Sequence, residues 1–176
     1  MVLLSENFDS SGATYTPSPS ALGAGTDYRV AFTNIFHAPP DYWVITNPAT
    51  AFFMTGDASF GDHTSGSGQM FFFDGAASTS TRISYTTLNL VAGVTYTFSF
   101  WGTCSNNGDI PVLSGKLDGQ TIVGSTNLTT ITGVWLPYTV TFTVATTGLH
   151  TLSIVDLNTD FAANDGAIDD VLLTSR

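Results

Sequence analysis

Basic side chains are almost missing from this sequence. Its 176 residues include only four Lys and Arg residues together, with Lys116 as the single lysine, against 14 Asp and Glu residues. The formal net charge is therefore −10 at pH 7. Because binding to phosphate backbones and to anionic membrane surfaces depends on clustered Lys and Arg, the composition argues against nucleic acid and anionic membranes as partners.

Cysteine, long apolar segments and catalytic motifs are equally scarce. Cys104 is the only cysteine, so the chain forms neither an intrachain disulfide nor a cysteine-rich metal site. No segment reaches the ~18 apolar residues that span a bilayer, so we expect no membrane insertion. The first residues lack the basic and long apolar regions of a secretory signal. The sequence also lacks the HExxH, GxSxG and phosphate-loop patterns.

Strand-forming residues dominate what is present. The chain has 28 threonines and 13 phenylalanines, which favour strands, and 17 glycines, which supply turns. Of the acidic residues 13 are Asp, which suits loops and cation sites, and only Glu6 is Glu. No stretch of ten or more residues shows a convincing helical apolar period. The composition predicts an all-β protein.

Alternating apolar and polar residues mark the individual strands. In Thr95–Trp101, the aromatic residues at 96, 98 and 100 share one face, and Trp101 lies on the other with Thr and Ser. Turn pairs such as Asp118-Gly119 separate the strands, and five prolines before residue 50 argue against central strands there. We expect one domain, 1–176, with the fold of a two-sheet antiparallel β-sandwich (jelly roll). The other expected strands are Gln69–Phe73, Ile83–Leu90, Val112–Leu117, Thr121–Ser125, Tyr138–Val144, His150–Val155 and Ile168–Leu173.

An acidic turn precedes the last strand. Asp165, Asp169 and Asp170 fall within six residues, and such close carboxylates repel one another unless a positive charge lies among them. Carboxylates and loop carbonyls are the ligands that calcium prefers. The pattern favours a bound hard cation over a solvated acidic loop.

Four segments, in chain order, resemble the signature of one family. They are Leu4–Asp9 (LSENFD), Gly61–Met70 (GDHTSGSGQM), Ala92–Trp101 (AGVTYTFSFW) and Asn164–Val171 (NDGAIDDV). Together they resemble the MAM-like and carbohydrate-binding-module-like (galactose-binding-like) jelly-roll domains that bind calcium in bacterial extracellular proteins. Because that scaffold serves adhesion, glycan binding and accessory roles, the resemblance implies a fold but no single activity.

The resemblance implies a structural Ca²⁺ ion that joins the first and last strands. Carried over residue by residue, its ligands are Asp9, Asp62 and Asp169, with Glu6 and Asp170 as alternates. Asp9 departs from the pattern, since many relatives have the longer Glu after the first-strand Phe. The role that the resemblance implies for this ion is structural: it holds the two ends of the chain together.

No catalytic constellation is visible. The three histidines, His37, His63 and His150, are far apart and show no metal-pair spacing, and we interpret His63 as a loop residue. Asp109 and Asp118 could face across a cleft as a glycosidase pair, but the near absence of Glu makes a hydrolase the least favoured alternative. We expect no catalytic residue.

Aromatic residues give the better functional lead. A sugar ring stacks its apolar face on Trp or Tyr, while Asp, Asn and Gln hold its hydroxyls. The candidate ligand-binding residues are Trp101, Tyr42, Trp43 and Asp109; Trp135 is a further candidate, although most tryptophans of sandwiches are core or edge-covering residues.

The sequence thus predicts a non-catalytic, calcium-stabilised module that binds glycans or another cell-surface polymer outside the cell. The alternative is a structural subunit of a surface layer, fibre or virion appendage. Threonine-rich faces with very few lysines lack the usual protection of strand edges, which suits contacts between identical subunits.

Overall fold

The computed structural model describes residues 1–9, 43–46, 60–73, 75, 77–106, 110–160 and 164–176. Every regular element in these residues is a β-strand. A search of the same residues finds no helix with the length and apolarity needed to cross a membrane. The prediction of an all-β protein is confirmed.

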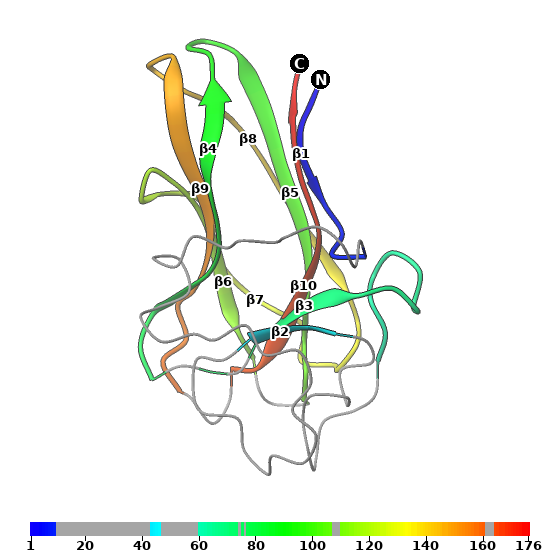
Figure 1. The fold of residues 1–176 in the computed structure, drawn as a ribbon. Helices are drawn as coiled ribbons and strands as arrows, with labels where there is room; N and C mark the ends of the chain where they lie inside the picture. Colours follow the sequence, from blue (N-terminus) through cyan, green and yellow to red (C-terminus); the bar gives the residue numbers. More distant parts are fainter. Residues whose placement is uncertain (10–42, 47–59, 74, 76, 107–109, 161–163) are drawn as a thin grey trace.

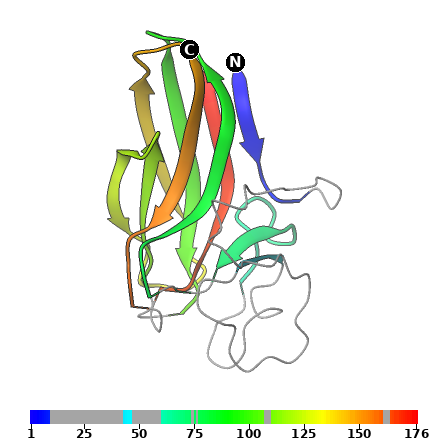
Figure 2. The ribbon, with the colours of Figure 1, turned by 60° about the vertical axis from the view of Figure 1, so that its left-hand side comes forward.

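Ten strands of the described part form two antiparallel sheets that pack face to face as a sandwich (Figures 1 and 2). The six-stranded sheet has the order β2–β3–β10–β5–β8, with β1 also paired to β10, and the four-stranded sheet has the order β4–β9–β6–β7. The strands are β1 (Val2–Glu6), β2 (Trp43–Thr46), β3 (Met70–Phe73), β4 (Ser80–Leu90), β5 (Thr95–Cys104), β6 (Val112–Leu117), β7 (Gln120–Asn127), β8 (Leu136–Thr143), β9 (Gly148–Asp156) and β10 (Gly166–Ser175).

All strands expected from alternation are present, and they correspond to β3 to β10. Sequence analysis did not predict β2 separately, because its four residues are too few to show a period. It lies at the end of the sheet order, beside β3. That position agrees with the expectation that the proline-containing region supplies no central strand.

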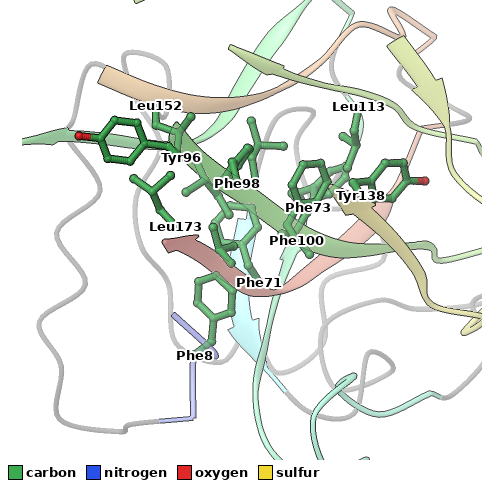
Figure 3. Close-up of a cluster of buried hydrophobic side chains, with 14 of the residues drawn as sticks. Phe8, Phe71, Phe73, Tyr96, Phe98, Phe100, Leu113, Tyr138, Leu152 and Leu173 are labelled. Atoms are coloured by element: carbon green, nitrogen blue, oxygen red, sulfur yellow. The ribbon is translucent and has the colours of Figure 1, made fainter. Parts of the chain in front are cut away.

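The core lies between the two sheets and is rich in aromatic side chains (Figure 3). Strand β5 alternates as predicted, with Tyr96, Phe98 and Phe100 buried. The ring of Phe100 stacks on that of Tyr138 from β8, with centroids 4.9 Å apart. Each fully buried aromatic side chain contributes roughly 1.5–3 kcal/mol of transfer free energy, so this row is a main source of sandwich stability.

Strand β10, the last strand, pairs with the first strand, β1, and so brings the two ends of the chain together. It pairs with β5 along one edge and with β1 and β3 along the other. The N-terminal ammonium of Met1 donates to the carbonyl of Ser175 at 2.7 Å, and both termini lie at the same end of the sandwich (Figure 1).

Candidate ligand-binding site and acidic loop

The candidate site begins at an interruption in β10. Residues 166–168 pair with β3 and residues 171–174 pair with β1, so the two partners share one edge of β10 in succession. On the opposite edge, the register with β5 shifts between Asp169 and Leu172. Asp170 has φ 48°, in the left-handed region that Asp tolerates better than most residues. Two adjacent aspartates therefore stand where neither β1 nor β3 pairs with β10.

The loop of residues 61–68 occupies this interruption. The backbone N–H groups of His63 and Thr64 donate to Oδ2 of Asp169 at 2.9 and 3.4 Å. Oδ1 of Asp169 accepts from the N–H of Asp170 at 2.8 Å. Hydrogen bonds from backbone N–H groups to an ionised carboxylate are charge-assisted, and the buried carboxyl group of Asp169 fixes the loop to the sheet.

A second carboxylate, Asp62, holds the loop in shape. It accepts from the N–H groups of Ser65 at 2.9 Å and Gly68 at 2.8 Å. Asp9, just after β1, accepts from the N–H of Gln69 at 2.7 Å. A Cβ on Gly68 would overlap the Asp9 carboxylate and stand 2.9 Å from Oδ2 of Asp62. The two carboxylates therefore converge on a position where only glycine fits.

Two of the carboxylates in this region are buried. Asp169 and Asp62 are 0% and 4% exposed, and none of the described hydrogen bonds to either carboxylate comes from Lys or Arg. Burial raises the pKa of Asp169 to about 7; the charge of Asp170 adds to this rise, and the backbone N–H donors oppose it. A bound cation would offset the cost of the buried anion.

The predicted calcium ligands are only partly brought together. Asp9, Asp62 and Asp169 all bind the 61–69 segment, whereas Oε1 of Glu6 accepts from the N–H of Phe8 at 2.8 Å. Across the described residues, no three His, Cys, Asp or Glu side chains are arranged to hold a metal ion. The oxygen-rich donor set suits calcium, and the calcium site stays a prediction.

Asp170 contacts the side chain of His63. The Nδ1 atom of His63 lies 2.6 Å from Oδ2 of Asp170, and the hydroxyl of Thr64 donates to Oδ1 of Asp170 at 2.8 Å. The imidazole stacks on the indole of Trp101, with ring centroids 3.8 Å apart and an interplanar angle of 16°. His63 therefore covers one face of the tryptophan that the sequence singled out.

Trp135 completes an aromatic cluster with Trp101 and His63. Its Nε1–H donates to the carbonyl of Gly61 at 3.2 Å. Its ring meets His63 edge to face at 6.0 Å and Phe60 edge to face at 6.2 Å. We call Trp101, His63 and Trp135 the aromatic cluster; each of its members is half-buried.

Exposed apolar residues adjoin the aromatic cluster in sequence. Ile131, Val134 and Leu136 are 60%, 42% and 37% exposed, and they flank Trp135 in and after a turn closed by a hydrogen bond from Val134 N–H to the Ile131 carbonyl. Rings and aliphatic side chains next to polar groups are the usual lining of a ligand site.

The remaining predicted site residues are placed as follows. Trp101 lies on the outer face of the six-stranded sheet, as expected. Tyr42 and Asp109 lie outside the described residues, and of Trp43 only the backbone, in β2, is described. Asp118, the other half of the glycosidase alternative, lies in the β6–β7 turn with its carboxylate 2.6 Å from Nδ1 of His150.

Sequence analysis overlooked His63 as part of the cluster. It is a loop residue, as interpreted, but its ring packs on Trp101 and its Nδ1 contacts Asp170. These contacts span residues far apart in the chain, and no local period reveals them. The one available signal was that both interacting segments, Gly61–Met70 and Asn164–Val171, belong to the family signature.

Comparison with known proteins shows a shared fold. No family model and no curated protein matches the sequence. The chain is similar over 99% of its length to the CBM22-1–GH10 modules of Clostridium thermocellum xylanase 10B complexed with xylohexaose (TM-score 0.56, 15% identity, 28% of that chain). It is similar over 99% to the CBM22-1 xylan-binding domain of Paenibacillus barcinonensis Xyn10C (TM-score 0.52, 10% identity, 94% of that chain).

A partial similarity links 52% of the chain to 65% of the sugar-binding C-terminal domain of EclA (TM-score 0.46, 22% identity). The xylanase 10B and Xyn10C similarities, which each span almost the whole chain, establish a β-sandwich fold shared with carbohydrate-binding modules.

Proposed function

We propose that this protein is a non-catalytic glycan-binding module of the cell exterior, with a role in binding or adhesion to surface polymers. The aromatic cluster carries the proposal: three rings from two loops and a strand gather on the outer face of the six-stranded sheet. The fold shared with xylan-binding and other carbohydrate-binding modules supports it.

The cluster has the chemistry that a sugar requires. Partly exposed rings offer apolar faces to the C–H groups of a pyranose. Asp170 and Thr64 stand beside them with polar atoms for its hydroxyls, and the side chain of Asp170 is 29% exposed. His63 ties these parts together, because it stacks on Trp101 and contacts Asp170.

The negative charge of the protein favours uncharged glycans over acidic ones. The protein carries a net charge of −10 and four basic residues, and the polar rim of the cluster includes a carboxylate. An acidic surface repels uronate-rich or sulfated polymers. The proposed ligand is therefore an uncharged polysaccharide.

We also propose a structural Ca²⁺ ion, held by Asp9, Asp62 and Asp169, with Glu6 and Asp170 as alternates. Two observations support this: Asp62 and Asp169 are buried with no Lys or Arg donor among their described hydrogen bonds, and Asp9 and Asp62 converge on Gly68. The ion would supply positive charge where the 61–68 loop meets β10. It would stabilise the loop that carries His63, and so the aromatic cluster.

A second candidate is a structural subunit of a surface layer, fibre or virion appendage. The specific observation in its favour is the outer face of β8, where Thr139, Thr141 and Thr143 are all exposed. Uncharged hydroxyl faces of this kind suit repeated contacts between copies. A glycosidase is the least favoured function, and its predicted pair Asp109 and Asp118 gains no support from the described residues.

The glycan proposal is tested by calorimetry and affinity electrophoresis with xylohexaose and a panel of uncharged polysaccharides. Loss of one buried aromatic contact costs roughly 2 kcal/mol, so Trp101→Ala should weaken binding about 30-fold. Trp101→Phe should retain part of it. Leu149→Ala is the matched control, because Leu149 is 73% exposed and lies in the other sheet.

Two outcomes would contradict the proposal. One is the absence of binding to every uncharged glycan in the panel, with and without Ca²⁺. The other is equal binding by Trp101→Ala and the unmodified protein, with both folded as judged by circular dichroism. Release of reducing sugar from the same polysaccharides would instead support the hydrolase.

A further inference from the structure

Strand β8 forms one edge of the six-stranded sheet. It pairs with β5 on one side, from Thr95 opposite Thr143 to Gly102 opposite Leu136. No strand of the described residues pairs with its other side. An edge of this kind presents backbone N–H and C=O groups that can pair with a further strand.

The other edge strands of the described part carry features that discourage pairing. β4 contains Arg82, and its register with β9 shifts at two places. The pairing of β7 with β6 is also interrupted twice. β1 has five residues, an interruption and Glu6, and β2 has four residues. Bulges, charges and short length are the usual ways in which proteins protect sheet edges.

Strand β8 has almost none of these protections. Its eight residues, LPYTVTFT, include no charged side chain, and its register with β5 is unbroken. Pro137 at its second position limits further pairing to the remainder of the strand. A regular, uncharged, threonine-rich edge is therefore a template on which another strand can pair.

The sequence of β8 suits antiparallel pairing with the β8 strand of a second copy of the protein. In an antiparallel pair of identical strands the contact is two-fold symmetric, so the same residues serve both copies. With the axis at Val140, Thr139 of one copy lies opposite Thr141 of the other. Threonine pairs across antiparallel strands are favourable. Although each copy carries a net charge of −10, this contact brings no charged side chain of β8 opposite another.

We propose that two copies of this protein pair antiparallel through β8 and join their six-stranded sheets into one continuous sheet. The threonines of the outer face would then form one uncharged surface across both copies, with an aromatic cluster in each. The proposal is independent of glycan binding, because Thr139 and Thr141 are not members of the aromatic cluster.

Sedimentation velocity over a wide range of protein concentration tests the pairing. We expect a monomer–dimer equilibrium that strengthens with salt, since salt screens the repulsion between acidic copies. Thr141→Lys places two like charges near the axis and should weaken the dimer by about tenfold or more. Thermal melts of this variant check that the monomer is still folded.

Thr97→Lys is the matched control. Thr97 lies opposite Thr141 on β5 and shares its face, but both edges of β5 are occupied, by β10 and β8. Edge pairing predicts that Thr97→Lys keeps the dimer, and that amides of β8 exchange more slowly in the dimer. A monomer at every concentration and salt level, a dimer that Thr141→Lys leaves intact, or equal loss in both variants would overturn the proposal.

Discussion

Asp156 and Asp169 are both fully buried aspartates, one in each sheet, but their surroundings differ. The carboxylate of Asp156 lies 2.9 Å from Nη2 of Arg82, and the guanidinium of Arg82 lies 4.5 Å above the ring centre of Phe73. Both carboxylates accept hydrogen bonds from backbone N–H groups, but Asp169 lies next to Asp170, and none of its described hydrogen bonds comes from Lys or Arg.

The two aspartates therefore differ in the charges that surround their carboxyl groups. Burial raises the pKa of Asp156, and the charge and hydrogen bond of Arg82 oppose that rise. For Asp169, where burial also dominates, the adjacent carboxylate of Asp170 pushes the pKa further upward, to about 7. The Asp156 region contains its own counter-charge, whereas none of the described hydrogen bonds to Asp169 comes from Lys or Arg.

Among the changes that test this comparison, replacing Arg82 should cause the largest loss of stability. Arg82→Met leaves the carboxylate of Asp156 buried without its cation, and breaking a buried ion pair in this way costs about 3–5 kcal/mol. For a chain of this size the melting temperature should fall by roughly 10 °C. Circular dichroism melts at pH 7 provide the measurement.

The double variant Arg82→Met with Asp156→Asn is the control for that result. Removal of the negative charge should recover part of the lost stability, because the uncompensated anion is the main cause of the loss. A cost below about 1 kcal/mol for Arg82→Met would mean that Asp156 is not an anion in the folded protein, and the contrast with Asp169 would disappear.

Calcium should have the next largest effect. Ligands that bind only the folded state stabilise it by mass action, about 2.7 kcal/mol at a concentration 100 times Kd. We expect Ca²⁺ to raise the melting temperature by several degrees and EDTA to reverse the rise, with Mg²⁺ much less effective. Asp169→Ala should abolish the response, whereas Arg82→Met should keep it.

The pH dependence of the calcium-free protein provides a separate test. Because the folded-state pKa of Asp169 is raised to about 7 from 3.8, its contribution is fully present below pH 3.8 and is lost as pH rises through about 7. In EDTA, stability should therefore decline between about pH 4 and pH 7 and level off above that, and saturating Ca²⁺ should reduce the decline. If neither Ca²⁺ nor Asp169→Ala changed the melting temperature, a bound cation would be ruled out.

Sequence reasoning succeeded where the signal is local. The alternation in Thr95–Trp101 predicted both the buried face of β5 and the outward position of Trp101, because side-chain direction in a strand has a period of two. The closeness of Asp169 and Asp170 is an equally local signal, and the bound cation inferred from it stays a prediction. Neither inference requires knowledge of how distant segments meet.

The missed features depend on long-range contacts. The stack of His63 on Trp101, the Arg82–Asp156 pair and the His150–Asp118 pair each join residues at least 32 positions apart. Each partner alone is an ordinary residue of a strand or loop. The register of β9 with β4 and β6 brings the second and third pairs together, and the interruption of β10 between Ile168 and Val171 is where the loop of His63 binds.

The smallest effect on stability is expected from replacing a third aspartate, Asp118. Its surroundings are intermediate between those of Asp156 and Asp169. Asp118 has a partner that can lose its charge: His150 places Nδ1 2.6 Å from Asp118 and Nε2 3.0 Å from the carbonyl of Thr146. Both contacts are satisfied as hydrogen bonds only when the ring is protonated. The hydrogen bond with Asp118 is the main cause that raises the pKa of His150.

His150 therefore contributes stability that is fully present below pH 6.5 and is lost as pH rises through its raised folded-state pKa. The backbone hydrogen bond from Thr151 lowers the pKa of Asp118, so its contribution is lost only in strong acid. Because the side chain of Asp118 is 50% exposed, Asp118→Asn should cost under about 1 kcal/mol near pH 6 and less at pH 9. NMR titration of His150 checks the cause, since its pKa should fall in Asp118→Asn; an unchanged pKa would show that Asp118 does not hold the charge.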